Sequence, residues 1–228
     1  MQMKVSFYGH STFYLELNNH KLLFDPFITE NPLVTDKNIS FLKPEYILIS
    51  HGHSDHLADA EPIAKLNASK IISNYEITNW FGAKNIAGHP INHGGKAKFD
   101  FGTVKYVNAV HTSSLPDGSN GGDPGGFVVW NENKCFYFAG DTALTMDMKL
   151  IPLTCPKLDF AILPIGDNFT MGYEDAAIAA EFIQCDKIIG CHYDTFGYIK
   201  INKEKAKAAF EAKGKELILL NIGQSIDL

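Results

Sequence analysis

Long apolar runs are absent from this sequence of 228 residues. No stretch approaches the ~20 consecutive apolar residues of a membrane-spanning helix. The first residues lead directly into a strand pattern at Lys4, without the basic and apolar regions of a secretory signal. We therefore expect a protein that does not partner with a membrane. Because 45% of the residues are hydrophobic, the chain still has enough apolar side chains for a large core.

Cysteine and clustered positive charge are also scarce. Four cysteines are scattered at positions 135, 155, 185 and 191 without a C-x-x-C pair, which is typical of free thiols, so we expect a cytoplasmic protein. No run of lysine or arginine forms a basic stripe, and the net charge is −6 with a pI of about 5.8. Nucleic acid is therefore disfavoured as a partner. The sequence also lacks the G-x-S-x-G segment of a serine nucleophile.

The most informative segment is His51-Gly52-His53-Ser54-Asp55-His56, which follows an apolar run over residues 46–50. A single histidine is usually an ordinary core or surface residue. Three imidazoles beside a carboxylate would instead pack poorly, and they would repel one another once protonated. Imidazole and carboxylate are good ligands for zinc and neighbouring first-row metals. The pattern H-x-H-x-D-H at a strand end therefore predicts a metal-binding loop.

Apolar periodicity divides the rest of the chain into strands and helices. The expected strands cover residues 4–8, 12–17, 21–24, 46–50, 71–73, 98–101, 103–110, 127–130, 134–139, 159–165, 187–191 and 216–220. The expected helices cover the segment from the histidine-rich loop to residue 66, then residues 75–82, 143–151, 174–183 and 202–213. Loops are expected at 28–44 and 117–126, and the second suits a mobile edge of an active site.

The two halves of the chain repeat one pattern. Each half opens with antiparallel strands and closes with strands that alternate with helices. This repetition predicts an α/β fold, a four-layer αβ/βα sandwich in which two mixed sheets pack face to face with helices outside. No linker interrupts the pattern, so we expect a single domain over residues 1–228.

Three further candidate ligands stand where later strands end. His111 follows the strand that ends at residue 110, Asp141 follows 134–139, and His192 follows 187–191. Strand ends from two packed sheets can meet along one edge of a sandwich. We therefore expect these side chains to join the histidine-rich loop in a shared cleft.

The order of these ligands resembles that of the metallo-β-lactamase superfamily. Other segments look like one branch of it, the small metal-dependent hydrolases similar to ascorbate-6-phosphate lactonase and the phosphodiesterase-like members. The resemblance covers essentially the whole chain, and it is specific for the fold and the metal site but weak for the substrate. The segments are Gly9-His10-Ser11, Asp25-Pro26-Phe27, Ala139-Gly140-Asp141-Thr142, Leu163-Pro164-Ile165-Gly166-Asp167 and Phe169-Thr170-Met171-Gly172.

The resemblance implies a binuclear metal site and an α/β sandwich of the metallo-β-lactamase type. Two divalent ions are implied, zinc first, with manganese, iron or nickel as alternatives. The implied ligands are His51, His53 and His111 for the first metal, Asp55, His56 and His192 for the second, and Asp141 as the bridge between them.

Two residues have implied catalytic roles besides ligation. Asp55 would orient a hydroxide held between the metals. His10 faces the pocket by the same resemblance, although an ordinary turn residue is an equally good interpretation. Diiron flavoprotein relatives place a glutamate where His53 stands, so redox chemistry at iron is disfavoured.

The expected function is that of a metal-dependent hydrolase. A metal-bridging hydroxide would attack a small, anionic ester, lactone or phosphodiester. The alternative enzyme is a phosphodiesterase or nuclease acting on nucleotides or nucleic acid. The alternative outside enzymes is a metal-binding scaffold with a vestigial site, which the loss of a ligand would favour, and none is missing. We expect a small molecule as the partner and leave self-association into a homo-oligomer open.

Other polar residues have weaker assignments. Asp25 either orients a ligand histidine or caps the following proline turn, and we favour the former. Cys191 is expected to be a buried core thiol. Asp167, Thr170 and Met171 are candidates for the pocket wall. Outside the ligand set we place His20, His89 and His93.

Overall fold

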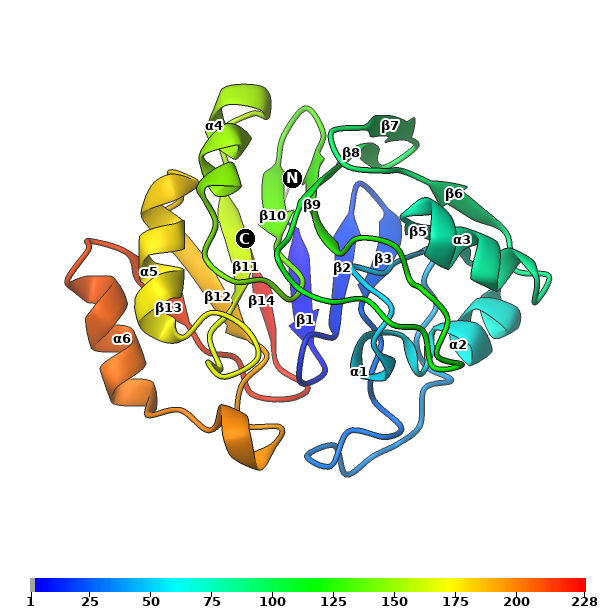
Figure 1. Cartoon of the computed structure of the whole chain (residues 1–228), viewed down its shortest axis with the longest axis horizontal. Coiled ribbons are helices and arrows are strands. Elements are labelled where there is room, and N and C mark those ends of the chain that lie inside the picture. The colour runs from blue at the N-terminus through cyan, green and yellow to red at the C-terminus, as the bar shows by residue number, and fades with distance from the viewer. Residues whose placement is uncertain (1–2) are drawn as a thin grey trace.

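Two mixed sheets of seven strands each form the centre of the molecule (Figure 1). The computed structural model describes residues 3–228. In spatial order, the first sheet contains β14 (Ser225–Asp227), β1 (Lys4–Phe7), β2 (Phe13–Leu17), β3 (His20–Phe24), β4 (Tyr46–Leu48), β5 (Lys70–Ser73) and β6 (Gly88–Pro90). The second contains β13 (Glu216–Ile218), β12 (Lys187–Cys191), β11 (Phe160–Pro164), β10 (Cys135–Phe138), β9 (Gly125–Trp130), β8 (Gly102–Asn108) and β7 (Lys96–Phe99).

The two sheets repeat one order of strand directions. Strands β1 to β3 pair antiparallel, and β3 to β6 pair parallel. Likewise, β7 to β10 pair antiparallel, and β10 to β13 pair parallel. This is the internal repetition that the sequence pattern predicts. Its consequence for function is that corresponding strands of the two halves end in loops at one edge of the sandwich.

Helices cover the outer face of each sheet. The first sheet is covered by α1 (Ser54–Leu57), α2 (Ala60–Asn67) and α3 (Tyr75–Gly82). The second sheet is covered by α4 (Ile151–Thr154), α5 (Tyr173–Phe182) and α6 (Lys203–Glu211). The second half also contains the 3-10 helices η1 (Met146–Leu150) and η2 (Gly197–Ile199). Side chains alternate between layers, as a pleated strand requires. In β10, Phe136 and Phe138 pack between the sheets, whereas Tyr137 packs under the helices. The expected four-layer αβ/βα sandwich is therefore confirmed.

The observed elements differ from the expected ones in several places, one of which is the helix expected up to residue 66, observed as the two helices α1 and α2. The helix expected over 143–151 is instead η1 followed by α4, because Thr145 caps the first turn and a proline occupies the start of the second. The strand expected to be last, 216–220, is followed by β14 at the edge of the other sheet. The short strand β6 is also observed in addition to the expected strands.

Among residues 3–228, no helix combines the length and the apolar character needed to cross a membrane.

Candidate metal centre

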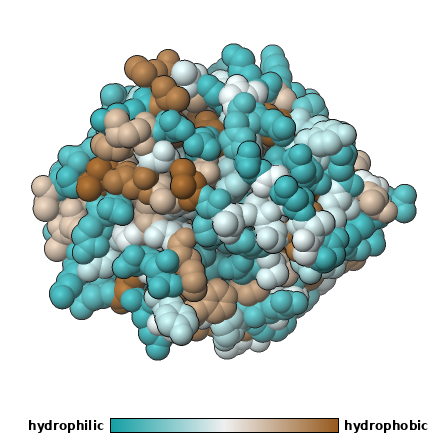
Figure 2. All heavy atoms as spheres, in the orientation of Figure 1, coloured by the Kyte–Doolittle hydropathy of each residue, from teal (hydrophilic) through white to brown (hydrophobic). Residues whose placement is uncertain are grey.

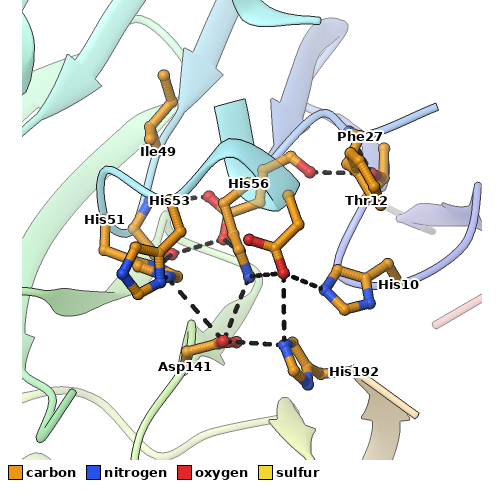
Figure 3. Close-up of polar contacts among 12 residues, drawn as sticks. His10, Thr12, Phe27, Ile49, His51, His53, His56, Asp141 and His192 are labelled. Carbon is orange, nitrogen blue, oxygen red and sulfur yellow. Dashed lines mark hydrogen bonds and ion pairs between the residues drawn. The ribbon is translucent and has the colours of Figure 1, made fainter. Parts of the chain in front are cut away.

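Eight polar side chains from both halves meet at one end of the sandwich. Figure 3 labels His10, His51, His53, His56, Asp141 and His192 among them. The first half supplies the loop after β4 and the turn between β1 and β2; the second supplies the segments after β8, β10 and β12. These strands share a direction within each sheet, so their carboxyl ends reach the same edge. All the sequence-predicted site residues are brought together: His10, His51, His53, Asp55, His56, His111, Asp141 and His192.

Asp141 lies at the middle of this cluster. Its Oδ2 atom is 2.9 Å from His192 Nε2, 3.3 Å from His56 Nε2, 3.6 Å from His111 Nε2 and 4.0 Å from His51 Nε2. One carboxylate thus faces imidazoles from both halves of the fold. Gly140, just before it, has a φ of +62°, and a Cβ atom there would lie 2.5 Å from Ser50 Cβ. The glycine of the G-D pair therefore allows the close approach that places Asp141.

The cluster divides into two groups around Asp141. His51, His53 and His111 form one group, in which His51 Nε2 lies 3.0 Å from His53 Nδ1. Asp55, His56 and His192 form the other, with Asp55 Oδ2 4.0 Å from each imidazole. The first group offers three imidazole nitrogens and the second adds a carboxylate oxygen to its imidazoles, while Asp141 Oδ2 lies within 4.0 Å of histidines of both. Imidazole and carboxylate at such short separations suit the coordination of a divalent transition metal.

His10 belongs to the second group and is not an ordinary turn residue. Its Nε2 atom lies 3.1 Å from Asp55 Oδ2, and its Nδ1 atom lies 2.9 Å from Thr195 Oγ1. The main chain reinforces this position, because the His192 amide donates to the His10 carbonyl at 2.9 Å. Both residues have left-handed backbones, with φ values of 53° and 55°. His10 is 2% exposed, so its ring lies behind Asp55 rather than at the open surface.

Asp25 holds candidate ligand histidines in place from behind the centre. Its Oδ2 atom accepts from His56 Nδ1 at 2.7 Å and from Ser50 Oγ at 2.5 Å, while its Oδ1 atom accepts from the Ser50 amide. Ser50 Oγ also lies 2.9 Å from His51 Nδ1. The contact expected for an orienting Asp25 is therefore present, and it extends through Ser50 to a second histidine. Sequence reasoning missed Ser50 and Thr195, because a lone hydroxyl residue carries no pattern.

Burial and charge tune these groups in opposite directions. Burial, helped by neighbouring histidines, lowers the pKa values of His51, His53 and His111, so their imidazoles are neutral near pH 7. Burial also opposes charge on His56, but Asp141, Asp55 and Asp25 outweigh it and raise its pKa well above the usual value.

The two carboxylates facing the histidines stay ionised despite burial. Burial opposes the charge of Asp141, yet His192 and His56 hold its pKa well below the usual range. Burial likewise opposes the charge of Asp55, and His56 and His10 hold its pKa low. A buried site that keeps two carboxylates ionised stabilises positive charge, whether on an imidazole or on a metal ion.

Several polar atoms of the cluster lack hydrogen bonds. Within residues 3–228, His56 Nε2, Asp141 Oδ1 and His192 Nδ1 are buried without a hydrogen-bond partner. His56 Nε2 is close to Asp141 Oδ2 but lacks hydrogen-bond geometry. Buried polar atoms are normally satisfied, so the unpaired Nε2 and Oδ1 atoms fit ligation of a metal. The donor set is thus chemically suited to the divalent ions that the sequence implies.

The remaining candidates lie outside the centre or in its wall. His20 Nδ1 pairs with Glu45 at 2.6 Å, His93 Nε2 lies 2.9 Å from the Pro124 carbonyl, and His89 lies on an exposed strand. Cys191 is buried in the core, as expected. Met171, expected in the pocket wall, is also a core residue at 1% exposure. The exposed residues of its loop include Asp167 and Phe169.

The loop expected over 117–126 is anchored at several points. Asn74 Nδ2 donates to the carbonyls of Gly121 and Asp123, and Trp80 Nε1 donates to Asp117 at 2.7 Å. Leu115, just before the loop, is buried in the core of the first half. The segment after His111 is therefore packed against α3, which fixes this side of the centre.

Comparison with known proteins identifies the family. A family model described as the beta-lactamase superfamily domain matches residues 4–192. A UPF0173 metal-dependent hydrolase of Christiangramia forsetii is 61% identical over 227 residues, covering 99% of this chain and all of that protein. YtkL of Bacillus subtilis, also a UPF0173 metal-dependent hydrolase, is 41% identical over 232 residues, covering 99% of this chain and all of that protein.

A solved structure agrees along the whole chain. Igni18, a metallo hydrolase from the hyperthermophilic archaeon Ignicoccus hospitalis, superposes with a TM-score of 0.91 at 29% identity, covering 100% of this chain and 99% of that one. The resemblance inferred from the ligand pattern is therefore confirmed for family and fold. The chain belongs to the β-lactamase superfamily and, within it, to the UPF0173 metal-dependent hydrolases.

Proposed function

We propose that this metal-dependent hydrolase binds two divalent metal ions and cleaves a small, anionic ester, lactone or phosphodiester. The observation that carries the proposal is the position of Asp141 Oδ2, within 4.0 Å of imidazoles contributed by both halves of the fold. A carboxylate in this position suits a shared ligand between two metals.

The proposed ligand sets follow the two groups of side chains. His51, His53 and His111 would hold one ion, and Asp55, His56 and His192 would hold the other, with Asp141 between them. The lowered pKa values of the first three histidines support this, because ligation needs a neutral imidazole. Zinc is the first choice for this mixed nitrogen and oxygen set, with manganese, iron and nickel as alternatives.

When bound, the metals would supply Lewis acidity and lower the pKa of a water molecule to about 7. The chain's own residues would then orient the reactants. Asp55 is only partly buried, so it lies between the interior and the open side of the centre, where it can orient the attacking water. His10 holds Asp55 in place and is itself held by Thr195.

His10 acts in this proposal as a positioning residue. Burial and the neighbouring His192 lower its pKa to about 4, against the opposing effect of Asp55, so it is neutral near pH 7. A carboxylate oxygen only accepts hydrogen bonds, so the neutral ring carries its proton on Nε2 and donates it to Asp55. The Thr195 hydroxyl can then donate to Nδ1. This chain of contacts keeps Asp55 ionised and fixed.

Charge supports an anionic substrate. The histidines with lowered pKa values add no charge near pH 7, and two divalent cations would more than offset Asp25, Asp55 and Asp141. The centre would therefore be net positive. Since the chain contains no arginine, the metals rather than a guanidinium would bind the anion.

All four cysteines are free, which supports a reducing, cytoplasmic setting.

Metal analysis of the purified protein tests the proposal, followed by assays on lactones, phosphodiesters and carboxylic esters. We expect two metal equivalents per chain and turnover that a chelator abolishes. His51→Ala and Asp141→Ala should each lose metal and turnover, whereas His89→Ala, a histidine outside the centre, should retain both. Full activity in either ligand variant would refute the assignment. Turnover of phosphodiesters alone would favour the phosphodiesterase alternative.

A further inference from the structure

Four apolar side chains with exposed surface lie on the segments beside the candidate metal ligands. Val110 is 51% exposed, Phe169 is 50% exposed and Tyr198 is 79% exposed, while Phe196 is half-buried. We refer to these four residues as the apolar rim. Figure 2 shows apolar surface near the lower edge of the molecule, in the region where Figure 1 places the segments after β11 and β12. These side chains contribute little to the core and expose apolar area to water.

Each segment of the rim adjoins a candidate metal ligand. Val110 precedes His111 in the chain, and its amide donates to Thr142 Oγ1 at 3.0 Å. The Met171 amide, beyond Phe169, donates to the Thr142 carbonyl, also at 3.0 Å. Thr142 follows Asp141, so two rim segments are fixed directly beside the central carboxylate.

The third segment of the rim follows His192. The Phe196 ring lies 5.4 Å from the His10 ring and 6.4 Å from the Phe27 ring, measured between centroids. Tyr198 lies two residues further, and its ring meets Phe169 edge-on at 6.3 Å. The segment after His192 therefore contacts the His10 side of the centre through Phe196, and it contacts the loop beside Asp141 through Tyr198.

The backbone holds these aromatic residues in fixed positions. Asp167 and Asn168 have φ values of 62° and 59°, and they form a tight turn closed by the Asp167 amide on the Met171 carbonyl at 3.1 Å. Aspartate and asparagine tolerate this left-handed backbone at modest cost. The turn places Phe169 at its tip. On the other segment, Asp194 accepts from the Ile201 amide at 3.1 Å, which closes the loop that carries Phe196 and Tyr198.

An apolar surface at a ligand-binding edge lowers the free energy of complexes that bury it. We propose that the apolar rim binds an aryl or alkyl group of the substrate, attached to the ester or lactone that the metal centre cleaves. This inference rests on the proposed function and narrows its substrate class. The substrate would then combine a polar or anionic reacting group at the metals with an apolar group against Phe169 and Tyr198.

Hydroxamates provide a test that does not depend on turnover, because the hydroxamate group chelates metals and carries a variable tail. Isothermal titration of the zinc-reconstituted protein would compare acetohydroxamate, hexanohydroxamate and benzohydroxamate. We expect the two larger tails to bind about tenfold more tightly than the acetyl tail. Phe169→Ala and Tyr198→Ala should each remove most of this difference while leaving acetohydroxamate affinity within about twofold.

Leu153→Ala is the matched control, because Leu153 is 76% exposed but lies on α4, away from the centre. It should retain the full preference for larger tails. Equal affinities for all three hydroxamates, or a preference that survives both rim substitutions, would overturn the assignment of the rim and leave the metal centre intact. A protein that binds zinc but none of the hydroxamates would contradict the rim as a part of the binding site. A protein that binds no zinc would contradict the proposed function itself.

Discussion

At the scale of single residues, the proposed ligand atoms are oriented by side chains outside the proposed ligand set. Asp25 is fully buried, and one carboxylate holds both the His56 ring and the Ser50 hydroxyl. A buried ligand histidine that loses its orienting partner can rotate or change tautomer. The orientation of the proposed ligands therefore depends on Asp25.

Asp25→Asn should weaken metal binding by about 10- to 100-fold, because an amide cannot accept from His56 and Ser50 as two carboxylate oxygens do. Competition with a chelator of known affinity measures the change. Asp167→Asn is the matched control, since Asp167 is exposed and bonds only the local backbone in the neighbouring loop. If Asp25→Asn retained wild-type metal affinity, the orienting role of Asp25 would be excluded.

The buried ring of His10 predicts a specific dependence of stability on pH in the metal-free protein. Its pKa is about 4 in the folded chain, against an ordinary value of 6.5. Between these values the unfolded chain binds a proton that the folded chain does not, so stability is lost as the pH falls from 6.5 towards 4. The loss from this one group is on the order of 3 kcal/mol.

Urea unfolding of chelator-treated protein at pH 7 and pH 4.5 measures this effect. His10→Asn suits the left-handed backbone at this position and removes the titrating ring. The variant should lose about 2–3 kcal/mol less stability over this interval than the parent protein. His56 titrates in the opposite sense but is present in both proteins, so its contribution is common to both. Equal losses in the two proteins would show that His10 is not held neutral.

At the scale of elements, the ends of β11 and β12 are held closely against each other. A Cβ atom on Gly166 would lie 2.1 Å from the His192 carbonyl oxygen, a main-chain atom that cannot turn aside. The same junction includes the bond from the Ile165 amide to the Cys191 carbonyl at 3.0 Å. The last candidate ligand, His192, is thus positioned by backbone packing against a neighbouring strand end.

Gly166→Ala should therefore displace His192, destabilise the fold by about 1–3 kcal/mol and reduce metal content. Gly197→Ala offers a matched control nearby, because no atom outside its immediate neighbours lies within 4 Å of the position of its Cβ. Thermal unfolding and metal analysis of both variants give the comparison. If Gly166→Ala kept normal stability and metal content, the ends of β11 and β12 could move apart at little cost, and backbone packing at Gly166 would not be what positions His192.

Most long elements could be predicted from apolar periodicity, because strands such as β10 and β12 are buried on both faces and rich in aromatic or branched residues. The strands β6 and β14 could not. Each has three residues with little apolar character, and each forms only through pairing at a sheet edge. The candidate ligands of the centre could also be predicted, because they follow a recognisable spacing in the sequence. Ser50, Thr195 and Phe196 could not, because they contact the centre only after distant segments have come together in the fold.

At the scale of the whole molecule, the centre joins two halves that share one core. Residues of both sheets, including Leu48 and Phe24 from the first and Phe138 and Ile162 from the second, form a single hydrophobic cluster. The candidate ligands come from loops of both halves as well. Metal binding and the packing between the sheets should therefore act on the same unfolding equilibrium. We also infer that the chain unfolds as the single domain expected from its sequence.

Calorimetry of the metal-loaded and chelator-treated protein tests this coupling. We expect one transition in each case, and a midpoint higher by about 10 °C at a metal activity a thousandfold above Kd, which corresponds to about 4 kcal/mol. Asp141→Ala should abolish the shift because it removes the carboxylate shared by both groups, whereas His89→Ala should keep it. Two separate transitions would show that the halves unfold independently. An unchanged midpoint would show that metal binding does not join them, since a ligand stabilises a fold only through the sites it completes.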